Sequence, residues 1–461
     1  MLVRCTCRFS SRLASSLPCR PVYEHATRWR QAYSSASHAA RAQLDRAIRQ
    51  PLLERMPSSG SIATAINQPL VGAVRVQWPD GAASSFDYMW LRDHCQSSES
   101  MHHVTRQRLL DTASLSRDLA PRAIDASSEG LKITWNDMDA HTSFYPWQWL
   151  RRRSYSPSLH CSPTFDKHLW AANEMQQSPP IVDYASVMSG DEGLLDWLDK
   201  IHIYGFAFVQ GVPVSPEATE QLIRRIAFIR ETHYGGFWDF TADLAHGDTA
   251  YTNLALGAHT DTTYFTDPCG LQMFHLLSSR DTHEGGHSLL VDGFACAARL
   301  RADSPQLYKL LSELPIPSHA SGDANALLRP LRPRPALEHD DEGQLISVRW
   351  NNDDRAPIGQ GKSWQGLWTL DDGRRVSRVV AFYHAVQAWE RIVRSKQAEY
   401  WTPLEPGKAL IFDNLRVLHG RSSFTGQRRL CGAYVNGDDY RSKRFLLRRR
   451  LGKQIEDDAV F

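Results

Sequence analysis

Apolar and polar residues alternate in short runs between residues 65 and 155, as in strands with one buried face. Residues 71–80 predict a strand that ends in a turn, and within 131–153 the apolar positions alternate around Trp135. We therefore expect a small β-rich N-terminal domain over 65–155. Residues 156–180 are rich in Ser and Pro and predict a linker.

Helical spacing becomes clear after this segment. Residues 192–205 carry apolar side chains at helical intervals and predict a helix that stops at Gly205. Residues 206–213 predict a strand. The stretch 215–235 opens with Ser and predicts an amphipathic helix that ends at Gly235.

From residue 251 onward, short apolar runs alternate with turns of Gly, Pro and Asp, a pattern typical of a β-sandwich or jelly roll. Helices are expected to interrupt this pattern at 293–315 and 376–396, and surface loops at 317–340 and 356–374. The fold class is therefore predicted as mainly β with added helices, with one large jelly-roll domain over 181–450.

Composition excludes several classes of protein. With 461 residues, of which 42% are hydrophobic, the chain can bury a substantial core. A formal net charge of +2 gives no reason to expect a nucleic-acid partner. The chain has no run of roughly 18 apolar residues, so we expect no membrane span. Eight cysteines in this length do not form the pattern of a disulfide framework.

Positive charge is concentrated at the N-terminus. Residues 1–44 contain seven Arg, seven Ser, no Lys and one acidic residue, Glu24. This composition predicts a mitochondrial presequence and disordered tail, with cleavage near residues 30–34 and import into the matrix. The alternative is an ordinary basic tail without a targeting role.

The sharpest chemical signal is the segment AHTDTTYF at 258–265. If this segment is a strand, His259 and Asp261 share one face, because side chains two apart point the same way. Far downstream, ALIFDNLRVLHGRS predicts a strand and a turn before His419. Two His and one carboxylate can hold Fe(II) and leave positions open for a co-substrate and O2. Taken alone this pattern is weak, because the chain has 19 His.

Two polar residues near these motifs favour a bound carboxylate. Arg428 follows His419 by nine residues, and its guanidinium could meet a ligand carboxylate if the chain turns back as a strand. Arg429 is the alternative, and either can instead form a surface salt bridge. Ser288 opens a predicted strand and offers a hydroxyl to the same carboxylate, unless it serves only the turn.

Aromatic residues also gather near these motifs. Aromatic faces grouped around a pocket can hold a quaternary ammonium group by cation–π attraction, although each one taken singly is more often a core residue. The candidates are Tyr234, Trp238, Tyr251 and Tyr434.

Four stretches together resemble the Fe(II)/2-oxoglutarate dioxygenases of carnitine biosynthesis, a TauD-like family. They are GDTAYTNLAL, HTDTTYFTDPCGLQMFHLL, LISVRWNNDDRA and FDNLRVLHGRSSFTGQRRLCGAY. The resemblance runs from about residue 71 to 450. It implies a double-stranded β-helix (jelly roll) and hydroxylation with Fe(II), 2-oxoglutarate and O2. The motifs look closest to the branch that acts on trimethyllysine rather than the one that acts on γ-butyrobetaine.

The resemblance assigns roles to individual residues. The metal triad falls on His259, Asp261 and His419, the arginine for the distal carboxylate of 2-oxoglutarate on Arg428, and the hydroxyl that assists it on Ser288. The trimethylammonium cage falls on Tyr234, Trp238, Tyr251 and Tyr434. The resemblance assigns binding of the other end of the substrate to Asp248, Asn351 and Asn352. We expect the acid at Asp248 to suit the α-ammonium group of trimethyllysine.

The N-terminal domain resembles the small zinc-binding domain of this family, but the match is incomplete. The sister enzyme has a Cys-x-Cys-x2-Cys cluster and a later His, whereas this chain offers only Cys95 in DHCQSSESMHH. His102, His103 and His141 could supply the missing ligands. If zinc binds, Cys95 and His141 are the best candidates; the alternative is a domain that folds without metal.

Other functions stay open at this stage. The same chemistry could act on γ-butyrobetaine or a taurine-like sulfonate, and a different class would be a non-catalytic metal-binding jelly roll. The presence of all three presumed iron ligands together with Arg428 argues against the non-catalytic class. The resemblance further implies ascorbate as reductant and a homodimer.

Overall fold

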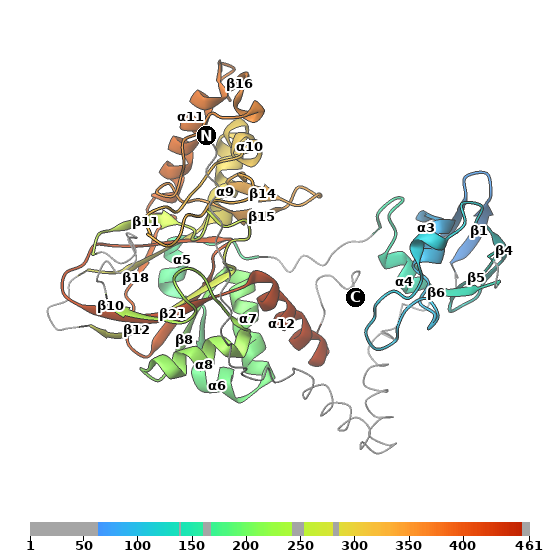
Figure 1. The fold of residues 1–461 in the computed structure, drawn as a ribbon, viewed down its shortest axis with the longest axis horizontal. Coiled ribbons are helices and arrows are strands. Elements are labelled where there is room, and N and C mark those ends of the chain that lie inside the picture. Colours follow the sequence, from blue (N-terminus) through green and yellow to red (C-terminus); the bar gives the residue numbers. More distant parts are fainter. Residues whose placement is uncertain (1–62, 138–139, 160–166, 242–252, 280–284, 454–461) are drawn as a thin grey trace, which may run out of the picture. The chain divides into compact units, whose positions relative to one another are not determined.

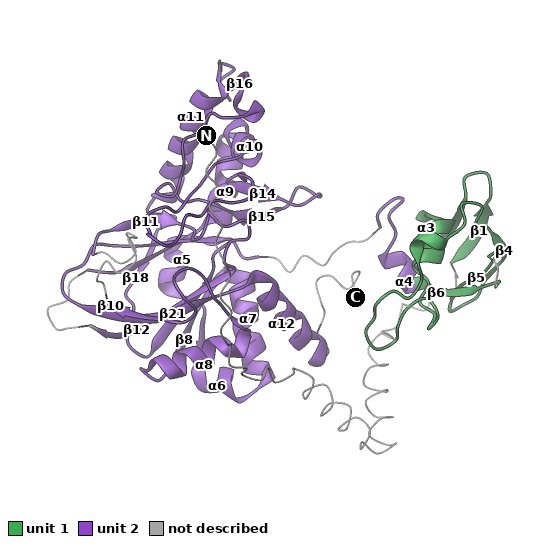
Figure 2. Cartoon of the chain, viewed as in Figure 1, with its two compact units in different colours: residues 1–147 green, residues 148–461 purple. Residues whose placement is uncertain are grey.

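The computed structural model describes residues 63–137, 140–159, 167–241, 253–279 and 285–453, and the predicted presequence lies outside them. The chain divides into two compact units, 1–147 and 148–461 (Figure 2). Within the described residues, no helix combines the length and apolar character needed to cross a membrane. The described cysteines, Cys95, Cys269, Cys296 and Cys431, are free thiols.

Unit 1 consists of two three-stranded antiparallel sheets and short helices (Figure 1). The side chains of Leu131, Ile133 and Trp135 are buried on one face of their strand, which confirms the alternation expected around Trp135. The elements are β1 (Thr64–Gln68), β2 (Ala73–Gln77), β3 (Ala83–Asp87), α3 (Tyr88–Asp93), η1 (Thr112–Ser114), β4 (Pro121–Ala126), β5 (Gly130–Trp135) and β6 (Thr142–Pro146).

Unit 2 is built on two facing sheets, the architecture expected of a jelly roll. The larger sheet has the order β10-β21-β12-β19-β8-β7, with β9 also paired to β21, and the smaller one has the order β11-β20-β13-β18. The strands of the larger sheet are β7 (Ile181–Asp183), β8 (Phe206–Gln210), β9 (Ile229–Arg230), β10 (Trp238–Thr241), β12 (Leu271–Ser279), β19 (Lys408–Asp413) and β21 (Arg428–Val435). Those of the smaller sheet are β11 (Leu256–His259), β13 (Ser288–Asp292), β18 (Tyr400–Thr402) and β20 (Val417–Arg421).

Alternation along the strands explains the layers of unit 2. In β8, Phe206 and Phe208 pack between the two sheets, whereas Ala207 and Val209 face the helices on the outer side. In β13, Leu290 points between the sheets and its two neighbours pack against the other group of helices. The helices that cover the larger sheet are α7 (Asp191–Tyr204), α8 (Pro216–Ile226) and α12 (Gly437–Arg450), with α6 (Tyr184–Ser189) beside them.

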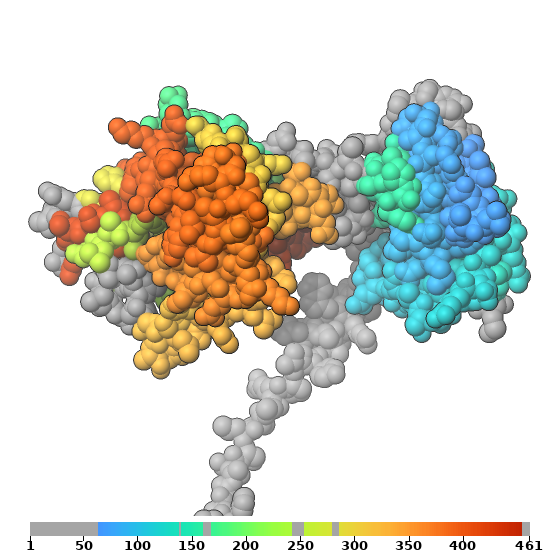
Figure 3. All heavy atoms as spheres, turned by 90° about the horizontal axis from the view of Figure 1, so that it is seen from above, coloured from blue at the N-terminus to red at the C-terminus, as the bar shows by residue number. Residues whose placement is uncertain are grey.

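The helices outside the smaller sheet are α9 (Gly293–Asp303), α10 (Pro305–Glu313) and α11 (Arg378–Val393). In the space-filling view, the orange segment that contains α11 lies against the yellow residues of α9 and α10 (Figure 3). The remaining elements are α4 (Trp147–Arg152), α5 (Ala172–Gln177), β14 (Leu337–His339), β15 (Leu345–Val348), η3 (Lys362–Trp364), β16 (Leu367–Thr369) and β17 (Arg375–Ser377). Ala172 and Met175 of α5 are buried in unit 2, so part of the segment expected as a linker belongs to its core.

The helices predicted for unit 2 are confirmed in part. Helix α7 ends at a left-handed Gly205 with φ of 79°, as the sequence predicted. The helix predicted over 215–235 is wrong beyond Ile226, because residues 229–230 pair with β21 and this tertiary pairing outweighs the helical pattern. The helix predicted over 293–315 is two helices, since a new one begins at Pro305.

The segment 356–374 is not the surface loop that its Gly and Pro content predicted. The side chains of Trp364 and Trp368 are buried against the helices outside the smaller sheet. Their indole N–H groups donate to the carbonyl oxygens of Pro315 and Gln306. Burial of the two large indole rings therefore stabilises a packed position of this segment more than the turn-forming residues around them favour an exposed loop.

A buried ion pair joins Asp292, the last residue of β13, to Arg416, which directly precedes β20. Both side chains are 1% exposed, and Arg416 Nη2 lies 2.9 Å from an Asp292 carboxylate oxygen. We expect Asp292→Ala to lower the free energy of unfolding by about 3–5 kcal/mol, because the change leaves a buried guanidinium without its counter-charge. Denaturant unfolding measures this loss, and Glu220→Ala, which breaks the exposed pair with Arg224, is the control with an expected loss below about 1 kcal/mol. Equal losses for the two variants would contradict the assignment.

Candidate active site

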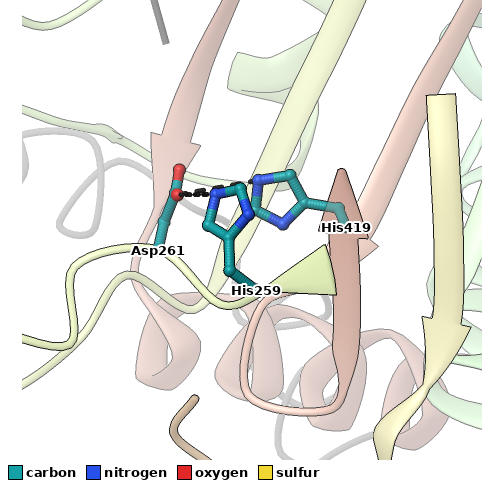
Figure 4. Close-up of side chains that lie close together, drawn as sticks. All are labelled: His259, Asp261 and His419. Carbon is teal, nitrogen blue, oxygen red and sulfur yellow. Dashed lines mark hydrogen bonds and ion pairs between the residues drawn. The ribbon is translucent and has the colours of Figure 1, made fainter. Parts of the chain in front are cut away.

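His259, Asp261 and His419 meet at one end of the smaller sheet (Figure 4). Strands β11 and β20 pair antiparallel, and His259 is directly opposite His419 in their register. His259 Nε2 lies 3.1 Å, and His419 Nε2 3.6 Å, from the same oxygen of Asp261, Oδ1. One candidate ligand atom from each residue lies within 4.8 Å of the others, so the three converge on one point. No other group of three or more such residues occurs in the part of the chain that the structure describes.

The geometry that brings in Asp261 differs from the expected one. Strand β11 ends at His259, and Asp261 lies in the turn that follows rather than on a shared strand face. The next residue, Thr262, has φ of 57°, the left-handed region that β-branched residues rarely adopt. Asn414 holds this turn, since its amide accepts from the Asp261 N–H at 2.7 Å and donates to the Asp261 carbonyl at 3.0 Å.

Contacts among the three residues set the protonation of the triad. The Nδ1–H of His259 donates to the carbonyl of Gly257 at 2.8 Å, so Nε2 is the atom that faces Asp261. Burial alone would lower the pKa of His259, but the hydrogen bond and charge of Asp261 raise it to about 9, so Nε2 carries a proton before a metal binds. Burial and the neighbouring charge of His259 together lower the pKa of His419 to about 3, so its imidazole is neutral. Burial alone would raise the pKa of Asp261, but the two histidines lower it below its ordinary value. The site therefore presents an ionised carboxylate beside two imidazoles, and a metal that displaces the Nε2 proton of His259 finds a set of ligands that suits Fe(II).

Arg428 and Ser288 lie where the sequence placed them, at the first positions of β21 and β13. Both line the same cavity of about 150 Å³ as the triad. Arg428 is 3% exposed, and its Nε and Nη1 atoms have no hydrogen-bond partner among the described residues. Burial without a counter-charge lowers the pKa of Arg428 to about 10. A buried guanidinium with free donors in a cavity fits the carboxylate of a bound acid such as 2-oxoglutarate.

Arg429, the alternative to Arg428, points elsewhere. Its guanidinium Nε donates to Asp239 at 2.8 Å in an exposed salt bridge between β21 and β10. The sequence prediction missed a second arginine, Arg421, which lines the cavity and lowers the pKa of Arg428 by its charge. The signal was available, because Arg421 is two residues after His419 on one strand and so shares its face.

Three of the four predicted cage residues, Tyr234, Trp238 and Tyr434, line the cavity. The rings of Trp238 and Tyr434 meet edge to face, with centroids 5.0 Å apart. Tyr264, which the sequence prediction missed, also lines the cavity, and its hydroxyl lies 3.0 Å from that of Tyr234. Tyr251 lies outside the described residues.

The residues predicted for the other end of a substrate divide into three groups. Asn351 lines the cavity, and its amide donates to Asp354 at 2.9 Å. Asn352 is not among the lining residues, and its side chain accepts a long hydrogen bond from Arg355. Asp248 lies outside the described residues.

Cys95 and His141 are in contact in unit 1, with Sγ and Nε2 3.2 Å apart. Burial alone would raise the pKa of the Cys95 thiol, but hydrogen bonds from His141, Ser143 and Ser97 lower it to about 7. His102 and His103 stack on each other. Structural zinc sites take four ligands, and in the described part of unit 1 the pair does not extend to a cluster of three. Zinc at this pair stays a prediction.

A jelly roll with two histidines and a carboxylate at one end, next to a buried arginine, defines the class of non-haem Fe(II) oxygenases that use a 2-oxo acid. Comparison with known proteins gives the same class. The model of the family described as "Taurine catabolism dioxygenase TauD, TfdA family" matches residues 167–434. The model described as "Gamma-butyrobetaine hydroxylase-like, N-terminal" matches residues 70–151.

Individual relatives show to which branch of this family the chain is similar. The chain is 42% identical to trimethyllysine dioxygenase of Meyerozyma guilliermondii over 84% of this chain and 96% of the relative. It is 40% identical to the mitochondrial trimethyllysine dioxygenase of Bos taurus over 77% and 80% of the two chains. Identity to gamma-butyrobetaine dioxygenase of a Pseudomonas strain is 32%, over 87% and 98%. The chain belongs to the trimethyllysine dioxygenase family of TauD-like Fe(II)/2-oxoglutarate oxygenases.

Proposed function

We propose that this protein hydroxylates N6,N6,N6-trimethyllysine at C3, the first step of carnitine biosynthesis. Trimethyllysine, 2-oxoglutarate and O2 give 3-hydroxytrimethyllysine, succinate and CO2. The observation that carries the proposal is a single cavity that combines the triad, the buried Arg428 and an aromatic wall. This aromatic wall consists of Tyr234, Trp238, Tyr264 and Tyr434. The triad suits a metal, the buried Arg428 suits a dicarboxylate, and the aromatic wall suits a quaternary ammonium group.

His259, Asp261 and His419 would hold Fe(II) through two imidazole nitrogens and one carboxylate oxygen. Bound there, the metal and 2-oxoglutarate supply the oxidising chemistry, in which one atom of O2 enters succinate and the other the substrate. Asn414 keeps the main chain at Asp261 in place, and the hydrogen bond to Gly257 occupies Nδ1 of His259, so Nε2 is the atom that would bind the metal.

Arg428 would bind the distal carboxylate of 2-oxoglutarate, with the hydroxyl of Ser288 beside it. Because the guanidinium is buried and its Nε and Nη1 are unpaired, a carboxylate gains charge-assisted hydrogen bonds there without displacing a protein partner. Arg421, next to Arg428, adds positive charge at the same end of the cavity. This end therefore selects an anion.

The aromatic wall would seat the trimethylammonium group. Each well-placed ring contributes about 0.5–2 kcal/mol to the binding of a cation. Trp238 and Tyr434 are buried and already packed edge to face, so we expect the wall to need little reordering when the substrate enters. Seating the head group fixes the distance from the metal to the carbon that reacts.

Turnover of paired substrates tests the proposal. We expect purified enzyme with Fe(II), 2-oxoglutarate and ascorbate to add one oxygen atom, about 16 Da, to trimethyllysine and to act far more weakly on γ-butyrobetaine. Mass spectrometry of both substrates in parallel reads the outcome, and lysine, which lacks the methyl groups, is the control. Oxidation of γ-butyrobetaine alone would overturn the choice of substrate, and oxidation of neither would favour the non-catalytic alternative.

We also propose a mitochondrial location, which the Arg-rich residues 1–44 and the mitochondrial relatives in animals support. A matrix address, a homodimer and ascorbate as the reductant are predictions that follow from the family. A reporter fused to residues 1–44 tests the address, and diffuse cytosolic signal would contradict it.

A further inference from the structure

Tyr434 connects the aromatic wall with the metal triad. Its ring packs edge to face on Trp238, and its hydroxyl donates a hydrogen bond of 2.6 Å to Oδ2 of Asp261. An ionised carboxylate has no hydrogen to donate, so the tyrosine is the donor. The residue is 5% exposed and lies near the end of β21, between Gln272 of β12 and Arg230 of β9.

The hydrogen bond distinguishes the two oxygens of Asp261. Oδ1 faces His259 and His419, whereas Oδ2 is occupied by Tyr434. A carboxylate with one oxygen engaged in this way offers the other as a single ligand atom. This leaves positions of an octahedral metal open, as the proposed reaction requires.

A neighbouring strand supports the orientation of the hydroxyl. Gln272 of β12 is opposite Tyr434 in register, and its Nε2 lies 3.5 Å from the tyrosine oxygen. A donor on that side leaves the tyrosine hydrogen for Asp261. Tyr234 forms the contrasting case, because its hydroxyl lies 3.0 Å from that of Tyr264, which is not a member of the triad.

We propose that the hydroxyl of Tyr434 is a positioning group that holds Asp261 as a one-oxygen ligand of the metal. The ring of the same residue belongs to the aromatic wall already described. One side chain then links the seating of the substrate to the geometry of the metal centre. The role of the ring rests on the proposed function, whereas the role of the hydroxyl concerns metal binding alone.

The variant Tyr434→Phe removes the hydroxyl and keeps the ring. Titration of metal-free protein with Co(II), read by its visible absorption, is expected to show roughly 10-fold weaker binding and a changed spectrum. The KM for trimethyllysine is expected to stay within about two-fold, because a phenyl ring still offers its face to the cation. Succinate formed per hydroxylated product is expected to rise, because a misplaced metal ligand uncouples the two half-reactions.

Tyr234→Phe is the matched control for metal binding alone, since it removes a hydroxyl from the same wall whose hydrogen-bond partner is Tyr264 rather than Asp261. We expect it to bind Co(II) like the parent protein. Gln272→Met is a second test should Tyr434→Phe fail to fold, and a weaker change of the same sign is expected from it. Parent-like Co(II) binding and spectrum in Tyr434→Phe, or in Gln272→Met if only that variant folds, would overturn the role of the hydroxyl.

The two proposals fail in different ways. If neither trimethyllysine nor γ-butyrobetaine is oxidised while Tyr434→Phe still weakens Co(II) binding, the substrate assignment fails and the positioning role stands. If trimethyllysine is oxidised and Co(II) binding is unchanged in Tyr434→Phe, the proposed function stands and the positioning role fails.

Discussion

Asp261→Ala is expected to abolish both metal binding and hydroxylation. The carboxylate is the only anionic ligand of the three, and both histidines lie within 3.6 Å of its Oδ1. Without it, two neutral imidazoles remain, and the affinity for Fe(II) should fall beyond the range in which turnover can be measured. Fe(II)-dependent release of succinate from 2-oxoglutarate measures the effect.

The control for this variant is Asp341→Ala, which removes an exposed carboxylate far from the triad in sequence. It should retain metal binding and turnover. Thermal melting shows whether Asp261→Ala is folded. Substantial turnover by the folded variant with added Fe(II) would contradict the role of the triad in binding the catalytic metal.

Arg428→Ala is expected to raise the KM for 2-oxoglutarate by roughly 10- to 100-fold, because charge-assisted hydrogen bonds to the carboxylate are lost. The KM for trimethyllysine should change far less, since the aromatic wall is left intact. Arg429→Ala is the matched control, because this neighbouring arginine is exposed and paired with Asp239. Equal increases in the two KM values for Arg428→Ala would contradict its assignment to the co-substrate.

Local patterns predicted the layers of the fold well. The alternation around Trp135, the stop at Gly205 and the jelly-roll strands all depend on side chains close together in sequence. The helix expected over 215–235 failed because its second half pairs with β21, a contact that no local pattern encodes. The surface loop predicted over 356–374 is wrong because the tryptophans of this segment pack on helices outside it.

The candidate site also shows the difference between features that the local sequence predicts and features that depend on distant residues. His259, Asp261 and His419 were predicted from their residue types and from a family resemblance, but the turn that carries Asp261 depends on Asn414, which is distant in sequence. The hydrogen bond from Tyr434 to Asp261 joins residues 173 positions apart. Arg421 could have been found from strand periodicity alone, whereas this hydrogen bond required the register of the larger sheet.

The central claim is that one cavity holds Fe(II), 2-oxoglutarate and a trimethylammonium substrate together. Anaerobic titration of the protein with Fe(II) and 2-oxoglutarate tests it most directly, through the visible charge-transfer absorption of the chelated metal. We predict that the band appears with the parent protein, is absent from Asp261→Ala, and shifts when trimethyllysine is added. A band that forms equally in Asp261→Ala, or that does not respond to trimethyllysine at saturating concentration, would contradict the account.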